Sequence, residues 1–440
     1  MEIIEIVSKL VKPSKPTPPT LCNYNISFFD DIPESVNVPL ILYYSTSHKE
    51  QKDIQTNIFN HLEISLSKTL TDFYPLAGRY THLASFIDCR DQGALYIEAK
   101  AKFQLSELLG LEQKLKLEMQ QDFLPCEVGN GVKNDDPLFN VKVTSFECGG
   151  VAIGMCISHK FADMDTFCKF IDNWTTRSRE IGNELEFKFE KYSTISSAAH
   201  LFPKPDVLAN HQLDPTSFEV NNCVMRLFLF KASAIRKLRE EVMSDHGNII
   251  RHRPSKVQLI VALLWKAFVD IDRQDGQSKA SFVGQAVNLR NIAVSENFYG
   301  NLSSFANARI EYNKVINLQV LVKLLHDSVN EMKNSYAKAL SQFEKDYEVL
   351  SKPFLECLEN ISSKDVNSYL FSSWCRFSFH TADFGWGKPV WKSITNEKIP
   401  NSVTMMDDEE GDGVEAWVHL DEKQMCELEK DSNLQAYMDA

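Results

Sequence analysis

His159 and Asp163 are four positions apart and directly follow a strongly apolar run at 151–158. Imidazole is the side chain whose ordinary pKa places its charge change nearest to neutral pH. His159 could therefore take a proton from a substrate hydroxyl as a general base. The H-x-x-x-D spacing also arises by chance, and a histidine near a helix start can serve only as a hydrogen-bonding group. The pair alone leaves both roles open.

The residues around His159 predict a strand, a loop and a helix in that order. The apolar run 151–158 is typical of a buried strand. In 164–180, large apolar residues recur on one face of a helix. A strand end holds a side chain more firmly than a free loop does. We therefore expect His159 to stand at the end of a rigid strand.

A second motif, Asp383-Phe384-Gly385-Trp386-Gly387, lies far downstream of the first. The two motifs, in this order and at this spacing, resemble those of the plant BAHD acyltransferase family. The prolines of 12–18 and the run 373–377 are most similar to its alkaloid acetyltransferase branch. Further stretches similar to the family are 74–79, 148–150, 288–290 and 300–301.

The mixture of apolar patterns indicates an α/β protein. The resemblance implies two domains of similar, chloramphenicol-acetyltransferase-like fold, joined by a crossover loop around a central solvent channel. The segment 192–215 has few periodic apolar positions and is the best candidate for that crossover. We therefore expect a domain 1–200 that carries His159 and a domain 201–440 that carries the 383–387 loop.

Other segments have patterns that predict single elements. Serine is a favoured helix cap, so Ser255 could begin a helix that runs to 270. The remaining predicted helices are 51–73, 233–243 and 315–343, the last perhaps in two pieces, and the predicted strands are 137–146, 223–230, 403–406 and 414–420.

The resemblance implies an acyl-CoA-dependent O-acyltransferase that esterifies a hydroxyl of a plant specialised metabolite, such as an alkaloid or terpenoid. Acetyl-CoA is the expected donor on branch resemblance. Malonyl-, hydroxycinnamoyl- and benzoyl-CoA remain open as donors, as does an amine as acceptor. A thioester is already activated and the chain has no G-x-S-x-G elbow, so we expect direct transfer. Two other classes remain: a non-catalytic accessory protein of this fold, and a thioester hydrolase.

Trp374 is the candidate for stabilising the oxyanion, because an indole N–H is only a hydrogen-bond donor. Ser372 and Ser373 are hydroxyl alternatives, and a buried core tryptophan is the structural one. The resemblance implies that Asp163 forms a salt bridge with Arg290 that shapes the site, rather than orienting the imidazole.

The downstream motif has a catalytic and a structural interpretation. Asp383 is sometimes proposed as catalytic in the family. Gly385 and Gly387 flank Trp386 as in a tight turn. We favour a role for this loop in supporting the acyl-CoA site.

Coenzyme A is a polyanion, so its site needs local positive charge in a chain of net charge −13. Arg253, Ser255 and Lys256 stand where a helix is expected to begin, and a helix amino terminus offers N–H groups to a phosphate. Lys388 is another candidate. A basic run is also common on ordinary solvated surface.

The composition limits the remaining possibilities. With 440 residues and 43% apolar residues, the chain can form two or three domains with substantial cores. The acidic balance argues against nucleic-acid binding. The ten cysteines contain no C-x-x-C pair, so we expect free thiols and no metal. No apolar run is long enough for a membrane helix, and the start is acidic, unlike a signal peptide. We expect a cytoplasmic monomer without a tightly bound cofactor.

Overall fold

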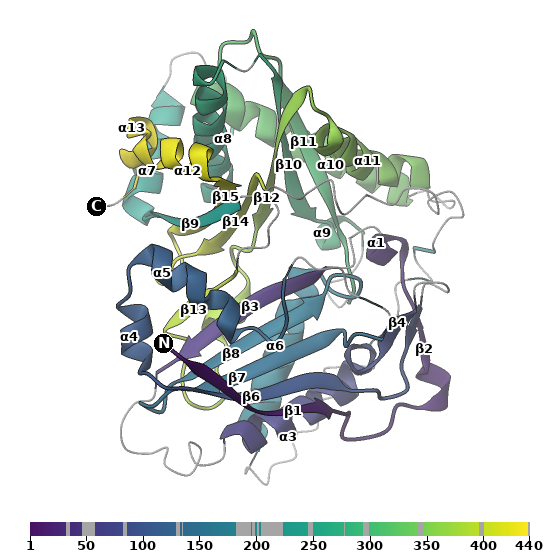
Figure 1. Ribbon diagram of the computed structural model, residues 1–440. Coiled ribbons are helices and arrows are strands. Elements are labelled where there is room, and N and C mark those ends of the chain that lie inside the picture. Colours follow the sequence, from purple (N-terminus) through teal and green to yellow (C-terminus); the bar gives the residue numbers. More distant parts are fainter. Residues whose placement is uncertain are drawn as a thin grey trace. The chain divides into compact units, whose positions relative to one another are not determined.

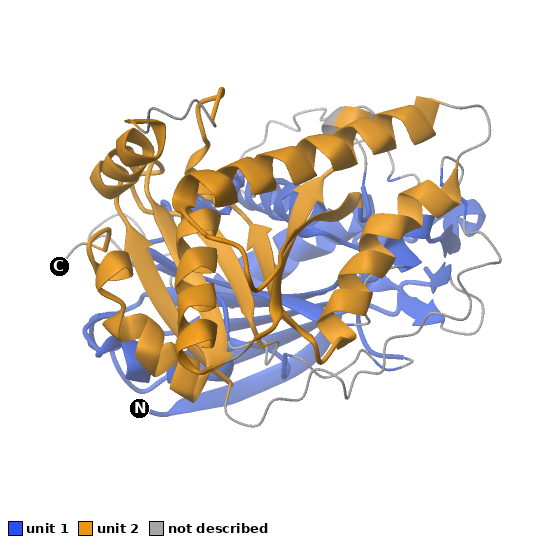
Figure 2. Cartoon of the chain, turned by 90° about the horizontal axis from the view of Figure 1, so that it is seen from above, with its two compact units in different colours: residues 1–210, 297–301, 377–397 blue, residues 211–296, 302–376, 398–440 orange. Residues whose placement is uncertain are grey.

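In the computed structural model, the chain forms two compact units (Figure 2). Unit 1 comprises Met1–Asn210, Asn297–Asn301 and Phe377–Glu397, and unit 2 comprises His211–Glu296, Leu302–Arg376 and Lys398–Ala440. The residues that the structure describes are 1–31, 36–45, 58–81, 86–128, 133, 135–181, 195, 199, 202–203, 223–244, 250–276, 278–293, 299–341, 346–395 and 400–438.

The two units do not correspond to a single cut in the sequence. Most of the expected crossover 192–215 lies outside the described residues. Two later segments, Asn297–Asn301 and Phe377–Glu397, belong to unit 1. The 383–387 loop, which we expected in the C-terminal domain, is therefore part of the same unit as His159.

Unit 1 is built on a six-stranded sheet of order β1-β6-β7-β8-β3-β13 (Figure 1). β6 and β7 are parallel, and the other neighbours are antiparallel. The strand β13 comes from the late segment of the chain and pairs with β3. The strands are β1 Ile3–Val11, β3 Asn37–Tyr44, β6 Ala94–Ala101, β7 Phe139–Ser145, β8 Val151–Ser158 and β13 Trp391–Ser393.

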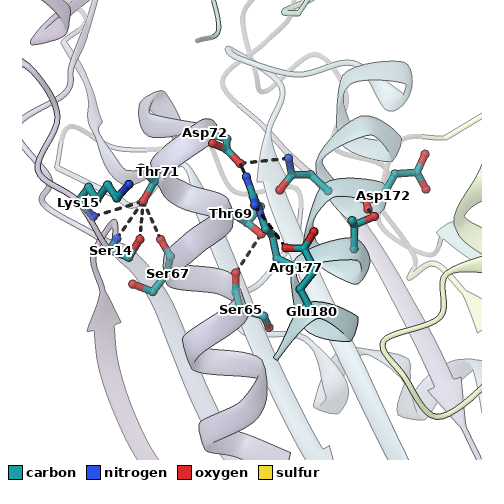
Figure 3. A network of polar contacts seen from close by, with 12 residues as sticks. Ser14, Lys15, Ser65, Ser67, Thr69, Thr71, Asp72, Asp172, Arg177 and Glu180 are labelled. Carbon is teal, nitrogen blue, oxygen red and sulfur yellow. Dashed lines mark hydrogen bonds and ion pairs between the residues drawn. The ribbon is translucent and has the colours of Figure 1, made fainter. Parts of the chain in front are cut away.

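Two long helices, α3 (Ile58–Asp72) and α6 (Met164–Glu180), pack against each other and against this sheet. Phe139 of β7 contacts Phe170 of α6 at a ring separation of 4.5 Å. Figure 3 shows the ion pair between Arg177 and Asp72, 2.7 Å long, which joins the two helices. These contacts with α3 and with the sheet hold α6 in place after β8.

The other face of the sheet is covered by shorter helices. Ile41, Tyr43 and Cys156 of the sheet share a core with α4 and the η3 turn. A β-carbon at Gly154 would lie 1.9 Å from Phe123 O, so only glycine allows this approach. The covering elements are α4 Leu105–Leu109, α5 Gln113–Glu118 and η3 Met119–Phe123.

The strand β8 is buried along its whole length because both faces of the sheet are covered.

The rest of unit 1 includes a small sheet of order β2-β5-β4 and several short helices. These elements are η1 Pro19–Leu21, β2 Asn23–Asn25, α1 Phe28–Asp31, η2 Tyr74–Ala77, β4 Arg79–Thr81, β5 Phe86–Asp88 and η7 Ser378–Thr381.

Unit 2 contains a second six-stranded sheet, of order β11-β10-β12-β14-β15-β9. The pairs β10–β12 and β12–β14 are parallel, and the other neighbours are antiparallel. The strands are β9 Cys223–Phe230, β10 Ala280–Asn288, β11 Ser303–Ile310, β12 Val366–Ser373, β14 Ser402–Asp407 and β15 Val414–Asp421.

One face of the second sheet forms a large core with α8 (Lys256–Gln274), whose residues Leu259–Trp265 are almost completely buried. Alternate residues of β10 face opposite ways: Val283 joins this core, and Phe282 packs with Cys357 of α11. The other helices of unit 2 are α7 Ala232–Ser244, α9 Arg290–Ala293, α10 Leu318–Ser341, α11 Tyr347–Ser362, α12 Glu422–Lys430 and α13 Ser432–Gln435.

The structure confirms the α/β class and most of the predicted elements. The helix 164–180 and the strands 151–158 and 223–230 have the predicted bounds. α3 begins at Ile58, and 51–57 lies outside the described residues. The described part of the region 315–343, which ends at residue 341, contains one helix, α10, rather than two pieces. Among the described helices, none has an apolar stretch long enough to cross a membrane.

Candidate active site

His159 stands directly after β8, as predicted. Its backbone N–H donates to Val36 O at 2.8 Å, which ties it to the start of β3. α6 begins five residues later at Met164. The imidazole therefore extends from backbone that is fixed on both sides.

Asn301 contacts His159 through two hydrogen bonds, one to the imidazole and one to the backbone oxygen. His159 Nδ1 and Asn301 Oδ1 are 2.9 Å apart, and Asn301 Nδ2 donates to His159 O at 2.7 Å. Because the amide nitrogen donates to a carbonyl, the amide oxygen must be the acceptor that faces the ring. Nδ1 therefore carries the hydrogen, an assignment made from the network. The lone pair of the neutral ring is on Nε2.

The surroundings of His159 keep the imidazole neutral. Burial lowers the pKa of His159 below its ordinary value of 6.5, and the charge of Lys160 acts in the same direction. A hydrogen bond to its own backbone, the charge of Asp163 and the hydrogen bond to Asn301 raise this pKa, but burial prevails. A neutral imidazole near pH 7 is the form that can accept a proton.

Asp163 caps the helix that follows the histidine. Its Oδ1 accepts from Thr166 N at 3.0 Å, the arrangement of a helix N-cap. The ring nitrogen that an orienting carboxylate would contact is already paired with Asn301. Arg290 is buried in unit 2, where its backbone N–H donates to Asn288 at 3.0 Å. The predicted salt bridge between Asp163 and Arg290 stays a prediction.

Asp383 closes the second motif into a tight loop. Its Oδ1 accepts from Gly385 N at 2.8 Å and from Gly387 N at 2.9 Å. Both glycines have positive φ, +112° and +101°, which other residues rarely adopt. Arg179 of α6 donates to the backbone oxygen of Asp383. These contacts support the structural interpretation of the motif.

The aromatic residues of the loop anchor it in unit 1. Phe384 and Trp386 are stacked, with ring centroids 5.6 Å apart, and both contact Tyr44 of β3. Ser178 of α6 donates to Phe384 O at 2.6 Å. Lys388, next to the loop, is exposed.

Trp374 lies in unit 2, immediately after β12. Its indole N–H donates to Ser372 Oγ at 3.2 Å, and its backbone N–H donates to Met405 O at 2.7 Å. The side chain is 7% exposed. The indole N–H is thus hydrogen-bonded to Ser372, one of the two serines whose hydroxyl was the alternative donor to the oxyanion.

The candidates for coenzyme A binding at the start of α8 differ in their contacts and in their exposure. Ser255 caps the helix by accepting from Gln258 N at 3.1 Å. Lys256 forms a 2.7 Å ion pair with Asp407 and donates to two carbonyls of the β14–β15 hairpin. Arg253 is exposed. Arg253 is therefore better placed than Lys256 to meet a phosphate.

Sequence reasoning missed the residues that support His159. The 300–301 stretch matched the family, but nothing indicated that Asn301 contacts the histidine. Asp30, a buried residue that accepts hydrogen bonds from Asn301, is not among the predicted site residues either. A signal was present, because an aspartate after the apolar residues Phe28 and Phe29 is unusual for a buried segment.

Comparison with known proteins identifies the family of this chain. The model of the transferase family matches residues 1–435. Stemmadenine O-acetyltransferase of Catharanthus roseus is 33% identical over 97% of this chain and 96% of that protein. Vinorine synthase of Rauvolfia serpentina is 34% identical over 96% and 95%. Its crystal structure has a TM-score of 0.82, covering 100% of this chain and 99% of that one. A family match along nearly the whole chain, together with a histidine held at a strand end and a closed 383–387 loop, shows that this chain belongs to the BAHD acyltransferases.

Proposed function

We propose that this acyltransferase moves an acetyl group from acetyl-CoA to a hydroxyl of an alkaloid or terpenoid, with His159 as the general base. The observation that carries the base assignment is the pairing of His159 Nδ1 with Asn301, which leaves Nε2 as the proton acceptor. The choice of acetyl and of the acceptor class is supported by the names of the relatives above.

The reaction follows from the neutral imidazole. Nε2 of His159 takes the hydroxyl proton as the alcohol oxygen bonds to the thioester carbonyl carbon. The resulting tetrahedral oxyanion then collapses, and the C–S bond breaks. The proton on the imidazole passes to the leaving thiolate, so the products are the ester and free coenzyme A. A positioned general base contributes roughly 10²–10⁴-fold to such a step.

The other candidates have supporting roles in this proposal. Trp374 and Ser372 form a hydrogen-bonded pair that could supply an N–H or O–H to the oxyanion. Asp383 keeps its loop closed. Arg253 and the capped amino terminus of α8 form the candidate site for a coenzyme A phosphate, with Lys388 as a further cation.

The test is a screen of acyl-CoA donors against alkaloid and terpenoid alcohols, read by mass spectrometry. We expect acetyl esters with the wild type and a loss of roughly 10²–10⁴-fold in His159→Ala. His380→Ala is the matched control, because the described contacts of His380 are with Phe377 O and the Phe379 ring. Undiminished transfer in His159→Ala would remove the base assignment.

The same screen addresses the other donors and classes. Transfer of malonyl in preference to acetyl would change the donor, and an amide product would change the acceptor. Release of coenzyme A without alcohol, at the rate of transfer, would indicate a thioester hydrolase.

A further inference from the structure

Asp30 is a buried carboxylate surrounded by hydrogen-bond donors. The residue lies on α1 and is 1% exposed. Its Oδ2 accepts from Ser27 N at 2.9 Å and from Ser27 Oγ at 2.6 Å. Its Oδ1 accepts from Asn301 N at 2.6 Å and from Asn301 Nδ2 at 3.0 Å. Four donors therefore converge on two oxygens, which suits the ionised carboxylate, an acceptor only.

This carboxylate fixes the orientation of the Asn301 amide. Nδ2 of Asn301 donates both to Asp30 Oδ1 and to His159 O. A flipped amide would place its oxygen against these two acceptors, which repel it. The amide oxygen is therefore directed at His159 Nδ1. Removing the carboxylate leaves one acceptor, His159 O, to hold this orientation.

We propose that Asp30 is a positioning residue: through Asn301 it holds His159 in the tautomer with hydrogen on Nδ1, which keeps Nε2 ready to accept a proton. The inference deepens the proposed function and rests on His159 being the base. Partners that orient the ligands of a metal typically change activity by about 10–100-fold when removed, and we expect a loss of the same order here.

The backbone that carries Asn301 has a second attachment that does not involve Asp30. Thr166 Oγ1 of α6 donates to Gly300 O at 2.8 Å, and Gly300 N and Thr166 Oγ1 are 3.1 Å apart. A change at Asp30 therefore leaves this segment tied to α6. The expected effect falls on the side-chain amide rather than on the path of the chain.

Titration of Asp30 adds a second proton to the pH dependence. Burial raises its pKa to about 6, while the hydrogen bonds from Asn301 and Ser27 oppose the rise. A protonated Asp30 carries its own hydrogen and can no longer accept all four donors. The charged or titratable groups around this network are Tyr24, Asp31, His159, Lys160 and Asp163.

The experiment measures the His159 tautomer directly and compares it with turnover. The protein is labelled with ¹⁵N-histidine, and the His159 signals are identified by their loss in His159→Gln. We expect an Nδ1–H tautomer in the wild type and a shift toward Nε2–H in Asp30→Ala. We also expect kcat to fall by about 10–100-fold with little change in KM.

Asp172→Asn is the matched control, because Asp172 is a half-buried carboxylate of unit 1 that, like Asp30, accepts from a serine hydroxyl, Ser378 at 2.9 Å. It should change neither the tautomer nor kcat. An unchanged Nδ1–H tautomer in folded Asp30→Ala would overturn the proposal. Full activity of His159→Gln would instead overturn the base assignment, so the two failures are distinguishable.

Asp30→Asn keeps the volume of the side chain and serves if the alanine variant does not fold. It removes one titrating group, so the acid limb of log kcat/KM against pH should approach a slope of 1, against 2 in the wild type. A wild-type slope of 1 that Asp30→Asn does not change would contradict the proposed role.

Discussion

Gly300 and Asp30 are so close that a β-carbon added to the glycine would stand 2.9 Å from Asp30 Oδ1. Gly300 also has a φ of +101°, so Gly300→Ala combines backbone strain with displacement of the carboxylate. The strain alone costs about 1–3 kcal/mol. We expect the variant to lower both the melting temperature and kcat.

Gly276→Ala separates the two effects. Gly276 also has a positive φ, +76°, but nothing lies within 4 Å of its added β-carbon. This variant should lose stability and keep kcat. Thermal unfolding and steady-state kinetics of both proteins check the prediction, and equal kcat in the two variants would contradict it.

Two substitutions of Asp383 distinguish a catalytic carboxylate from a structural one. Asparagine retains Oδ1 as the acceptor for Gly385 N and Gly387 N, so Asp383→Asn should keep most of the activity. Asp383→Ala removes both hydrogen bonds, each worth about 0.5–1.5 kcal/mol. It should destabilise the loop and raise KM for acyl-CoA. Complete loss of kcat in stable Asp383→Asn would show that the charge takes part in catalysis.

The acid limb of kcat/KM against pH should lie below pH 6.5. The pKa of His159 is lowered by burial, so the neutral, proton-accepting form persists to lower pH than in an ordinary histidine. Asp163→Asn removes a charge that raises this pKa and should move the limb to still lower pH. Asparagine also remains a good N-cap for α6. A shift to higher pH in kcat/KM would show that another group sets the limb.

Arg253 and Lys256 should respond differently to substitution. Lys256 pairs with Asp407 at 2.7 Å, so Lys256→Met should mainly lower the melting temperature. Arg253→Ala should raise KM for acyl-CoA and leave the melting temperature unchanged. Titration of each variant with coenzyme A, beside thermal unfolding, checks both. A rise in KM for Lys256→Met alone would reverse the assignment.

Replacing the indole of Trp374 tests the oxyanion role. Trp374→Phe keeps an aromatic ring and loses the N–H that contacts Ser372. If the N–H stabilises the oxyanion, kcat should fall by about 10²–10³-fold. Ser372→Ala is the companion variant, which removes the hydroxyl instead. Wild-type kcat in folded Trp374→Phe would assign the residue to the core.

The strand and helix around His159 could be predicted because each is encoded within a short window. The burial of β8 is visible in 151–158, and the apolar face of α6 in 164–180. The amide that orients the ring could not be predicted in this way. Asp30 and Asn301 are 271 positions apart, and no local period connects them. Family similarity marked 300–301, but only the folded chain shows which atoms it contacts.

The unit boundaries were equally hard to predict, for a related reason. β13 has three residues, too few to show a period, and it pairs with β3 from the start of the chain. A cut placed by composition near 192–215 assigns such a late segment to the wrong half. The two segments that return to unit 1 are specified by their contacts in the folded state.

These returning segments have a consequence for biosynthesis. During translation, the first 210 residues leave the ribosome well before Asn301 and β13 have been made. The nascent unit then exposes the edge of β3, and its histidine has no amide partner. Cotranslational folding can therefore give only a catalytically immature intermediate, and a fragment that ends before Asn297 should behave in the same way.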